Sequence, residues 1–309
     1  MDDIGFLKFN LYSKLFNCFY FCNFVISIVL PTKNEPAIEK VMEEINKIKI
    51  DKEILVIDNS EDDTALKAKK LGAKVIYQKS NGYGDALVQG FKFAKGEVIV
   101  MMDADSTYNP SFIPKLVEPI LNNEADIVLG KRNMTLKNMS FSNIFGNKVL
   151  TLILNTLYRM NINDSQTGMR AIKKSSLEKL QMYSPGMPLA SEMLIEAIKN
   201  NLRIAEIPIE YSERVGNSKQ KKIYGFYILG TTVRLIRDYN PLSLFGYVGG
   251  IIFFLGAVIG ADTFWNFLVY GTLTTPGRAI LSSMFIMLGL FSIGYGLMID
   301  ILIKELKKR

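Results

Sequence analysis

Strands and helices alternate through most of this chain, and this alternation restricts its fold more than any other feature. Short apolar runs predict strands at 25–30, 53–57, 74–77, 98–102, 127–129 and 204–211. Helix-type spacing predicts helices at 36–48, 63–71, 84–94, 111–122, 143–159 and 187–199. Repeating β and α units of this length predict an α/β fold with a mostly parallel sheet and helices on both faces. Because ligands of such sheets bind beyond the carboxyl ends of the strands, the residues that follow each strand become candidates for a site.

Two acidic residues, Asp103 and Asp105, directly follow the buried run at 98–102. Mg²⁺ and similar hard cations bind carboxylate oxygens, keep several waters and complete their shell with substrate phosphates. The pair therefore predicts a cation site that serves a phosphorylated ligand. The ordinary alternative for an isolated Asp-x-Asp pair is a surface turn.

The amino-acid composition excludes several kinds of catalytic and metal site. The chain has no histidine and a net charge of +7. A Ser-His-Asp triad, a Cys-His pair and a His-bound metal are therefore excluded. The positive charge favours an anionic partner, such as nucleic acid, anionic lipid or a phosphorylated substrate. Cys18 and Cys22 are the only cysteines, and we interpret them as small apolar residues on one helix face.

The C-terminal part has the composition of a membrane hairpin. Residues 242–259 and 279–303 are almost uncharged, and each stretch is long enough for a bilayer core, which needs roughly 20 residues. Lysines and arginines at 219–237 and 304–309 flank the pair, so the positive-inside rule predicts that both ends lie in the cytoplasm. Two buried helices of a soluble bundle are the alternative. Residues 1–24 lack the features of a signal peptide and predict an amphipathic helix, either on the membrane or packed on the domain.

Four segments that follow the predicted strands, 31–35, 58–60, 82–85 and 103–105, have the sequences PTKNE, DNS, GYGD and DAD. In this order and spacing, over residues 26–211, they resemble the inverting glycosyltransferases of family 2. The resemblance implies a GT-A (Rossmann-like) α/β fold and a divalent cation, Mg²⁺ or Mn²⁺, on Asp105, with Asp103 and Thr107 as further candidate ligands. It also implies a set of donor-binding residues: Pro31, Thr32, Asn34, Glu35, Asp58, Gly84, Asp103 and Ala104. Taken singly, 58–60 also fits a turn and 34–35 a helix cap.

The second half points to a subfamily. Residues 164–170, DSQTGMR, and 214–219, RVGNSK, are similar to segments of the polyprenyl-phosphate glycosyltransferases, which include the dolichyl-phosphate mannose, glucose and N-acetylglucosamine synthases. A flexible basic linker is the alternative for 214–219. The resemblance implies that Asp103, Asp105 and Arg214 are catalytic. It also implies that the phosphates are bound by basic and hydroxyl residues, namely Arg132, Arg170, Arg214, Ser218 and Lys219.

A phosphate acceptor also accounts for the missing base. A sugar hydroxyl must lose a proton before it attacks, whereas a lipid phosphate is already an anion near neutral pH. Such an acceptor needs positioning and charge screening. We therefore expect three partners, namely a nucleotide sugar, a polyprenyl or dolichyl phosphate and a lipid bilayer, and no nucleic acid. We also expect a homo-oligomer through the hairpin as a candidate assembly.

The expected organisation has four parts. Residues 1–24 form an interfacial segment, 25–215 the catalytic domain, 216–240 a basic amphipathic interface region and 241–309 a two-helix transmembrane hairpin with a basic tail. The catalytic domain is expected on the cytoplasmic face of the cell membrane, or of the endoplasmic reticulum in a eukaryote.

The donor is less constrained. Thr107 stands where the mannose synthases carry glutamine, and the string at 103–108, DADSTY, is closer to relatives that use UDP-sugars. We favour UDP-N-acetylglucosamine or UDP-glucose, with GDP-mannose as the rival.

Three other functions deserve comparison. A processive polysaccharide synthase would carry a Gln-x-x-Arg-Trp segment, but the only tryptophan is Trp265. Transfer to a hydroxyl would need a base, for which Glu192 is the candidate. A non-catalytic membrane sensor of nucleotide sugars, or a scaffold, has no need of the complete acidic pair.

Overall fold

The computed structural model describes residues 25–214, 230, 241–272 and 275–306. The chain divides into two units, Met1–Leu229 and Gly230–Arg309, and each is described by itself. The expected interfacial segment 1–24, and the interface region 216–240 apart from residue 230, lie outside the described residues.

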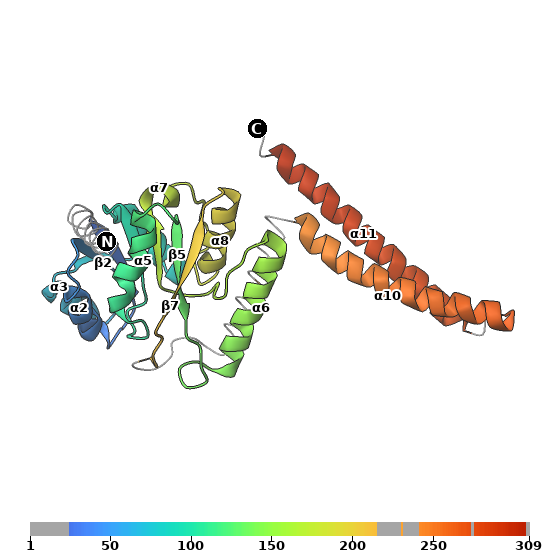
Figure 1. The fold of residues 1–309 in the computed structure, drawn as a ribbon, viewed down its shortest axis with the longest axis horizontal. Coiled ribbons are helices and arrows are strands. Elements are labelled where there is room, and N and C mark those ends of the chain that lie inside the picture. The colour runs from blue at the N-terminus through green and yellow to red at the C-terminus, as the bar shows by residue number, and fades with distance from the viewer. Residues whose placement is uncertain (1–24, 215–229, 231–240, 273–274, 307–309) are drawn as a thin grey trace, which may run out of the picture. The chain divides into compact units, whose positions relative to one another are not determined.

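A seven-stranded sheet forms the centre of the first unit (Figure 1). Its order is β3-β2-β1-β4-β6-β5-β7, and every neighbouring pair is parallel except the two pairs that involve β6. The strands are β1 Ile26–Thr32, β2 Lys52–Asp58, β3 Lys74–Tyr77, β4 Val98–Met101, β5 Ile127–Arg132, β6 Arg170–Lys173 and β7 Ile204–Ile209. The predicted mostly parallel α/β fold is confirmed. The antiparallel β6 was missed, because four residues with two basic ends carry no strand period.

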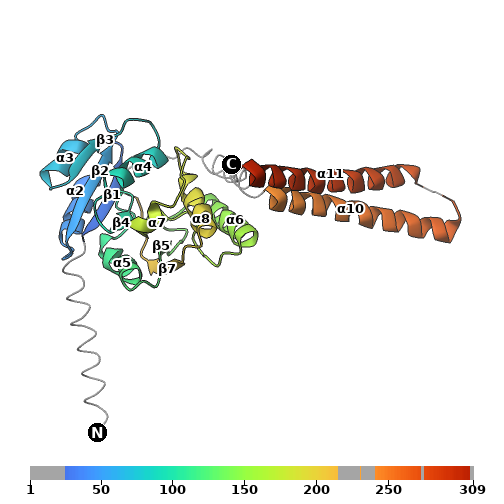
Figure 2. The same cartoon turned by 90° about the horizontal axis from the view of Figure 1, so that it is seen from above.

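Helices cover both faces of this sheet (Figure 2). They are α2 Ile38–Asn46, α3 Thr64–Lys70, α4 Tyr83–Phe93, α5 Ile113–Leu121, α6 Phe141–Tyr158, α7 Lys174–Leu177 and α8 Leu189–Lys199, with a 3₁₀ turn, η1, at Pro110–Phe112. Strand β1 was predicted to end before Pro31, but it continues to Thr32. Strand β4 pairs with β1 only as far as Val29, so the missing N–H of Pro31 lies beyond the end of that ladder.

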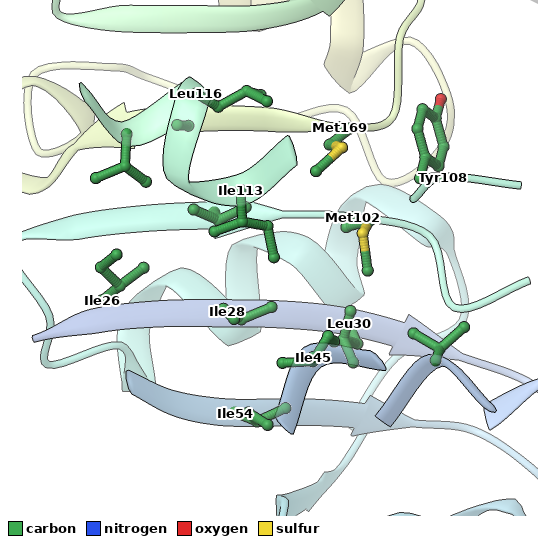
Figure 3. Packing of buried hydrophobic residues seen from close by; sticks show 14 of the residues in the cluster. Ile26, Ile28, Leu30, Ile45, Ile54, Met102, Tyr108, Ile113, Leu116 and Met169 are labelled. Atoms are coloured by element: carbon green, nitrogen blue, oxygen red, sulfur yellow. The ribbon is translucent and has the colours of Figure 1, made fainter. Parts of the chain in front are cut away.

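The two faces of the sheet use alternate residues of the same strands. Ile26, Ile28 and Leu30 of β1 join one buried cluster with α2 and α5 (Figure 3). Val29 points to the other face, where α4 packs closely: a Cβ at Gly90 would lie 2.3 Å from Val29 Cγ1. Each fully buried aliphatic side chain contributes about 1.5–3 kcal/mol, so this two-sided burial fixes the register of the central strands.

The second unit is a pair of packed helices, α10 Pro241–Tyr270 and α11 Pro276–Leu306. By length and composition both could cross a membrane, and at 1.5 Å per residue each exceeds a bilayer core of about 30 Å. Glycines allow close packing, because a Cβ at Gly249 would lie 2.6 Å from the carbonyl oxygen of Gly289. Across the connection, Arg278 Nη1 lies 3.3 Å from Asp262 Oδ2, with both side chains exposed.

Candidate active site

The carboxyl ends of β1 and β2 hold a buried carboxylate. The Asp58 residue is 1% exposed, and its Oδ1 accepts hydrogen bonds from Thr32 Oγ1 at 2.7 Å and Ser60 Oγ at 2.6 Å. Its Oδ2 accepts the Ser60 N–H at 3.2 Å, so the alternative of a turn at 58–60 describes part of what is seen. These three donors fix the orientation of Asp58 at the edge of the sheet.

The loop after β1 is tied to the loop after β2. Asn34 has a φ of +48°, a left-handed conformation that asparagine tolerates. Its N–H donates to Ser60 Oγ at 2.7 Å, and its Oδ1 accepts the Glu61 N–H at 2.8 Å. The helix-cap alternative for 34–35 is not observed, because α2 has Ala37 at its N-cap position and no side-chain cap. The loop therefore holds Asn34 and Glu35 at the edge, with Glu35 6% exposed.

The acidic pair follows β4, as predicted from the sequence. Asp105 Oδ1 accepts the N–H of Thr107 at 3.1 Å and its hydroxyl at 2.5 Å, while Asp103 Oδ1 accepts the Tyr83 hydroxyl at 2.7 Å. Burial, and then the charge of Asp105, raise the pKa of Asp103 from 3.8 to about 6. In the resting geometry Thr107 orients Asp105, and two neighbouring carboxylates bear a charge that a cation would offset.

Arg214 forms ion pairs with the loop after β1 and with the acidic pair after β4. Its Nη2 lies 3.3 Å from Glu35 Oε2, and its Nε lies 3.5 Å from Asp105 Oδ2. Glu35 and Arg214 are 179 residues apart in sequence, so only the fold brings them together. The structure thus gathers Glu35, Asp105 and Arg214, three residues predicted for the site, into one ion-pair cluster.

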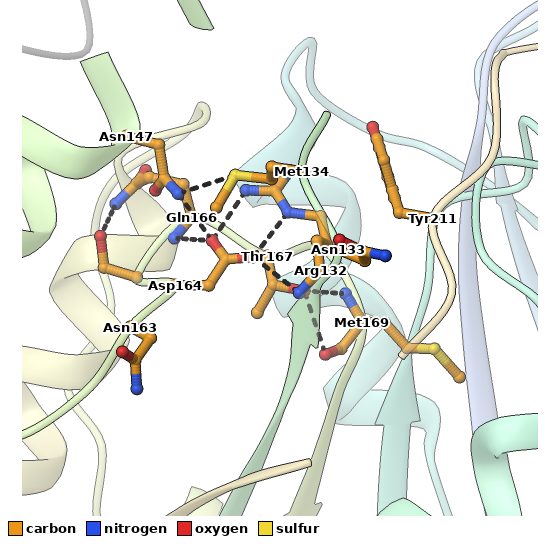
Figure 4. A network of polar contacts seen from close by, with 12 residues as sticks. Arg132, Asn133, Met134, Asn147, Asn163, Asp164, Gln166, Thr167, Met169 and Tyr211 are labelled. Carbon is orange, nitrogen blue, oxygen red and sulfur yellow. Dashed lines mark hydrogen bonds and ion pairs between the residues drawn. The ribbon is translucent and has the colours of Figure 1, made fainter. Parts of the chain in front are cut away.

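Arg132 makes a bidentate ion pair that the sequence did not suggest (Figure 4). Its Nε and Nη2 donate to Asp164 at 2.7 and 2.8 Å, and its backbone N–H donates to the same carboxylate at 3.1 Å. Asn147 Nδ2 adds a fourth hydrogen bond to Asp164 at 3.0 Å, and the Arg132 guanidinium lies 5.3 Å from the Tyr211 ring centroid. Burial opposes ionisation of Asp164, but these hydrogen bonds and the charge of Arg132 hold its pKa below the ordinary value. Arg132 is therefore a cation fixed in place at the end of β5.

Arg170 is placed differently from the prediction. It is fully buried, and its three nitrogens donate to the carbonyl oxygens of Thr167, Ala190 and Ser165. Complete burial lowers its pKa to about 10, so it stays charged at neutral pH. In this arrangement the guanidinium holds the 165–170 segment against α8, and we do not retain Arg170 as a phosphate ligand. Ser218 and Lys219 lie outside the described residues.

The glycines before and within α4 lie against another segment of backbone. A Cβ at Gly84 would lie 2.2 Å from the carbonyl oxygen of Ser184, and one at Gly82 would lie 2.1 Å from that of Pro185. The Pro185 carbonyl also accepts the N–H of Gly84 at 2.9 Å. The space beside these glycines is thus occupied by the 184–186 backbone rather than left open for a donor.

Glu192, the candidate base, is committed to the same loop. It is 1% exposed, and its carboxylate accepts the N–H groups of Tyr183 at 3.1 Å and Ser184 at 2.8 Å. A general base must reach the proton that it removes, and this carboxylate is buried against backbone amides. Glu192 therefore anchors the 183–186 loop, which in turn contacts the N-terminus of α4.

The residues present fit a divalent cation shared with a substrate. Within the described part of the chain, no three His, Cys, Asp or Glu residues are arranged to hold a metal ion by themselves. Asp103 and Asp105 supply carboxylate oxygens, and Mg²⁺ or Mn²⁺ in such sites is completed by waters and substrate phosphates. The donor set thus suits a metal that binds together with a diphosphate.

Sequence reasoning missed three side chains that shape this site. Tyr83 donates to Asp103, Tyr108 accepts the Gly168 N–H through its hydroxyl at 2.7 Å, and Asp164 holds Arg132. Their partners lie 20, 60 and 32 residues away. Tyr83, Tyr108 and Asp164 all lie inside segments considered for the site from the sequence, but no spacing indicated their partners.

A mostly parallel sheet with paired carboxylates after its central strand defines an α/β protein with a ligand site at the carboxyl ends of its strands. Residues 27–181 match Glycosyl transferase family 2, and the chain belongs to that family.

The chain is similar to several archaeal proteins. It is 35% identical to the low-salt glycan biosynthesis hexosyltransferase Agl6 of Haloferax volcanii, over 62% of this chain and 49% of that protein. It is 31% identical to a dolichyl-phosphate hexose transferase of the same organism, over 67% and 92% of the two chains. A UDP-N-acetylglucosamine–dolichyl-phosphate N-acetylglucosaminyltransferase of Methanococcus voltae is 32% identical, over 66% and 94%. The chain thus spans about half of the first relative and nearly all of the other two.

Among solved structures, the fold resembles glucosyl-3-phosphoglycerate synthase of Mycobacterium tuberculosis in complex with Mn²⁺, UDP and glucosyl-3-phosphoglycerate. The TM-score is 0.58 at 24% identity, over 69% of this chain and 79% of the other. At this identity the likeness concerns the fold alone.

Proposed function

We propose that this chain transfers a sugar from a nucleotide-diphosphate donor to a polyprenyl or dolichyl phosphate, with inversion at the anomeric carbon. The observation that carries the proposal is the cluster at the carboxyl edge, where Glu35, Asp105 and Arg214 meet beside Asp103. The names of two relatives that this chain covers almost completely, a dolichyl-phosphate hexose transferase and a dolichyl-phosphate N-acetylglucosaminyltransferase, support the lipid acceptor.

The residues divide into a donor side and an acceptor side. Asp58 and Glu35 bind the nucleoside part of the donor, and Asp103 contacts its ribose or sugar. Asp105, with Asp103, would hold a divalent cation, which stabilises charge on the leaving diphosphate when bound. Arg132, already fixed by Asp164, faces the acceptor phosphate as a rigid cation.

No base is needed for this reaction. The acceptor phosphate arrives ionised, so the protein has to align it with the anomeric carbon and screen its charge. Arg214 now pairs with Glu35 and Asp105, and it exchanges these partners for substrate phosphates when both substrates bind. The engagement of Glu192 with backbone amides supports a base-free mechanism.

The membrane placement follows from the second unit. Two helices that could span a bilayer and the cationic flanks of the sequence support a catalytic unit held at the cytoplasmic face. This placement puts it beside a lipid-borne acceptor. Self-association through the hairpin remains part of the proposal.

The test is a matrix of donors and acceptors. Purified full chain with Mg²⁺ or Mn²⁺ receives labelled UDP-N-acetylglucosamine, UDP-glucose or GDP-mannose, with or without dolichyl phosphate. We expect label in the organic phase with dolichyl phosphate, and a UDP-sugar as the best donor. Preference for GDP-mannose would make the chain a mannose transferase. Donor binding without turnover on any acceptor would support a nucleotide-sugar sensor and overturn the proposal.

A further inference from the structure

Helix α6 exposes several large apolar side chains. Its buried residues are Asn147, Leu150, Thr151 and Leu154, while Phe141 is 70%, Phe145 60% and Leu152 65% exposed. A surface helix of a water-soluble domain keeps mainly polar and charged residues on its outer face. Helix α2 of the same unit shows that normal pattern, with isoleucine, valine and methionine buried. The large apolar residues on the outer face of α6 therefore require an explanation.

The inward polar residues are explained by the site. Asn147 Nδ2 donates to Asp164 at 3.0 Å, and the Thr151 hydroxyl donates to Ser165 Oγ at 2.9 Å. Asp164 in turn holds Arg132. One face of α6 is thus part of the network that fixes the cation at the end of β5.

The outward apolar residues form one stripe. Positions 141, 145 and 152 recur at helical spacing, and the rings of Phe141 and Phe145 stack at a centroid distance of 6.2 Å. Leu136, just before the helix, is 73% exposed. We name Leu136, Phe141, Phe145 and Leu152 the α6 apolar stripe. Exposed lysines accompany it at 137 and 148.

We propose that the α6 apolar stripe docks on the surface of a lipid bilayer, with its lysines at the headgroups. This proposal rests on the proposed function for the presence of a membrane. Apolar residues with interspersed lysines are the composition of helices that lie in the interface of anionic membranes. The lysines would stabilise contact with a protein partner only if that partner were acidic. Two helices that could span a bilayer would keep the chain beside lipid.

Docking through this stripe would also act on the site. The face of α6 opposite to the stripe binds Asp164 and Ser165, so an α6 held at the lipid surface holds Asp164 and, through it, Arg132. The acceptor phosphate is borne by a headgroup at that same surface. The α6 helix is therefore a positioning element that sets the acceptor-side cation relative to the bilayer.

The docking test measures contact with lipid directly and needs no activity. In a full-length background with Cys18→Ser and Cys22→Ser, Phe145→Cys and the control Lys40→Cys on α2 are labelled with an environment-sensitive fluorophore. Each protein is placed in nanodiscs of anionic lipid, with or without a lipid-borne nitroxide quencher. We expect strong quenching at position 145 and none at position 40. Leu152→Cys provides a second position if Phe145→Cys does not fold.

Two outcomes would overturn the docking. If aqueous iodide quenches the label at position 145 and nitroxide lipid does not, the stripe lies in water. Protection from both quenchers would mean that a second copy, or another segment of this chain, covers it.

A kinetic variant separates this inference from the proposed function. Phe145→Glu should raise the KM for dolichyl phosphate by about tenfold, because it replaces lipid-buried apolar area by a charge. Its kcat, its affinity for the donor and its melting temperature should stay near those of the control Lys40→Glu. Lipid-linked product formed with an unchanged KM would leave the proposed function standing and refute the docking. Quenching that demonstrates docking, without any lipid-linked product, would support the docking and refute the proposed function.

Discussion

The two halves of the carboxyl edge handle charge in opposite ways. On the half built from β1, β2 and β4, Asp103 and Asp105 lie together, Arg214 pairs with Asp105, and the pKa of Asp103 is raised. On the half built from β5 and β6, Arg132 has a bidentate buried partner and Arg170 has three carbonyl acceptors. In the first half the carboxylates outnumber the one arginine that pairs with them, whereas in the second half each arginine already donates to protein acceptors.

This difference indicates which half of the site lowers the stability of the fold in order to bind a ligand. Like charges brought together in a buried site destabilise the fold until a counter-ion binds. Removal of one partner from a buried ion pair is strongly destabilising, because an uncompensated charge stays in the interior. We therefore expect substitutions on the acidic half to change activity with little loss of stability, and substitutions on the arginine half to unfold the domain.

The largest expected effect belongs to the acidic half. Asp105→Asn should reduce transfer by roughly 10³-fold, because the several kcal/mol that a metal supplies to the leaving group are lost. The melting temperature without metal should be unchanged or higher. Initial rates with labelled donor and differential scanning calorimetry measure the two quantities. Asp63→Asn, at an exposed position before α3, is the matched control, and an Asp105→Asn enzyme within a few fold of it would remove the metal role.

The next effect tests the arginine half. Asp164→Ala leaves Arg132 buried and unpaired, so we expect a loss of about 3–5 kcal/mol in the free energy of unfolding. Asp126→Ala, which breaks the exposed pair with Arg203, should cost only about 0–1 kcal/mol. Denaturant titrations of both variants give the comparison. Equal losses would mean that burial does not distinguish the two ion pairs.

The contrast between the halves also explains what the sequence could predict. The acidic residues follow strands whose apolar runs are visible, so the amino-acid pattern alone assigns Asp58, Asp103 and Asp105 to one edge. The second half depends on β6, a strand of four residues, and on partners up to 32 residues apart. Arg132 and Arg170 look alike in sequence, and only their burial among carbonyls or beside Asp164 separates their roles.

Glu192 and Gly84 teach the same lesson. Each residue type fitted a chemical role, as a base or as an opening for the donor. Each is instead used in a backbone contact with the 183–186 loop, and a contact of this kind leaves no periodic signal in the sequence.

A third prediction concerns pH and the acidic half. Asp103 has a raised pKa, so the folded protein prefers its protonated form. Protonation of Asp103 stabilises the folded state. This contribution to the free energy of unfolding is complete below pH 3.8 and is lost as the pH rises through about 6. A pKa raised from 3.8 to about 6 corresponds to roughly 3 kcal/mol at most.

The measurement is a comparison of melting temperatures with EDTA between pH 4 and 7. Asp103→Asn cannot titrate at this position, so its advantage over the wild-type protein should grow as the pH rises. A constant difference in melting temperature across this range would show that the pKa of Asp103 is not raised by folding. The acidic half would then not destabilise the fold as proposed.

The smallest expected effect falls at the contact between the 183–186 loop and α4. The Pro185 carbonyl, from the loop that Glu192 anchors, accepts the N–H of Gly84 at the start of α4, and Tyr83 beside it donates to Asp103. Gly84→Ala would place a methyl group 2.2 Å from the Ser184 carbonyl oxygen. The loop and α4 must then separate, at a cost of about 1–3 kcal/mol in stability.

Gly146→Ala on α6 is the control, because a Cβ there meets nothing within 4 Å and alanine favours a helix by about 0.5–1 kcal/mol. Separation at Gly84 moves Tyr83 away from Asp103, so Gly84→Ala should also weaken metal-dependent donor binding, which Gly146→Ala leaves intact. Calorimetric titration of donor with Mn²⁺ measures this. A Gly84→Ala protein that is less stable but binds donor normally would mean that the 183–186 loop supports the fold without positioning the acidic half.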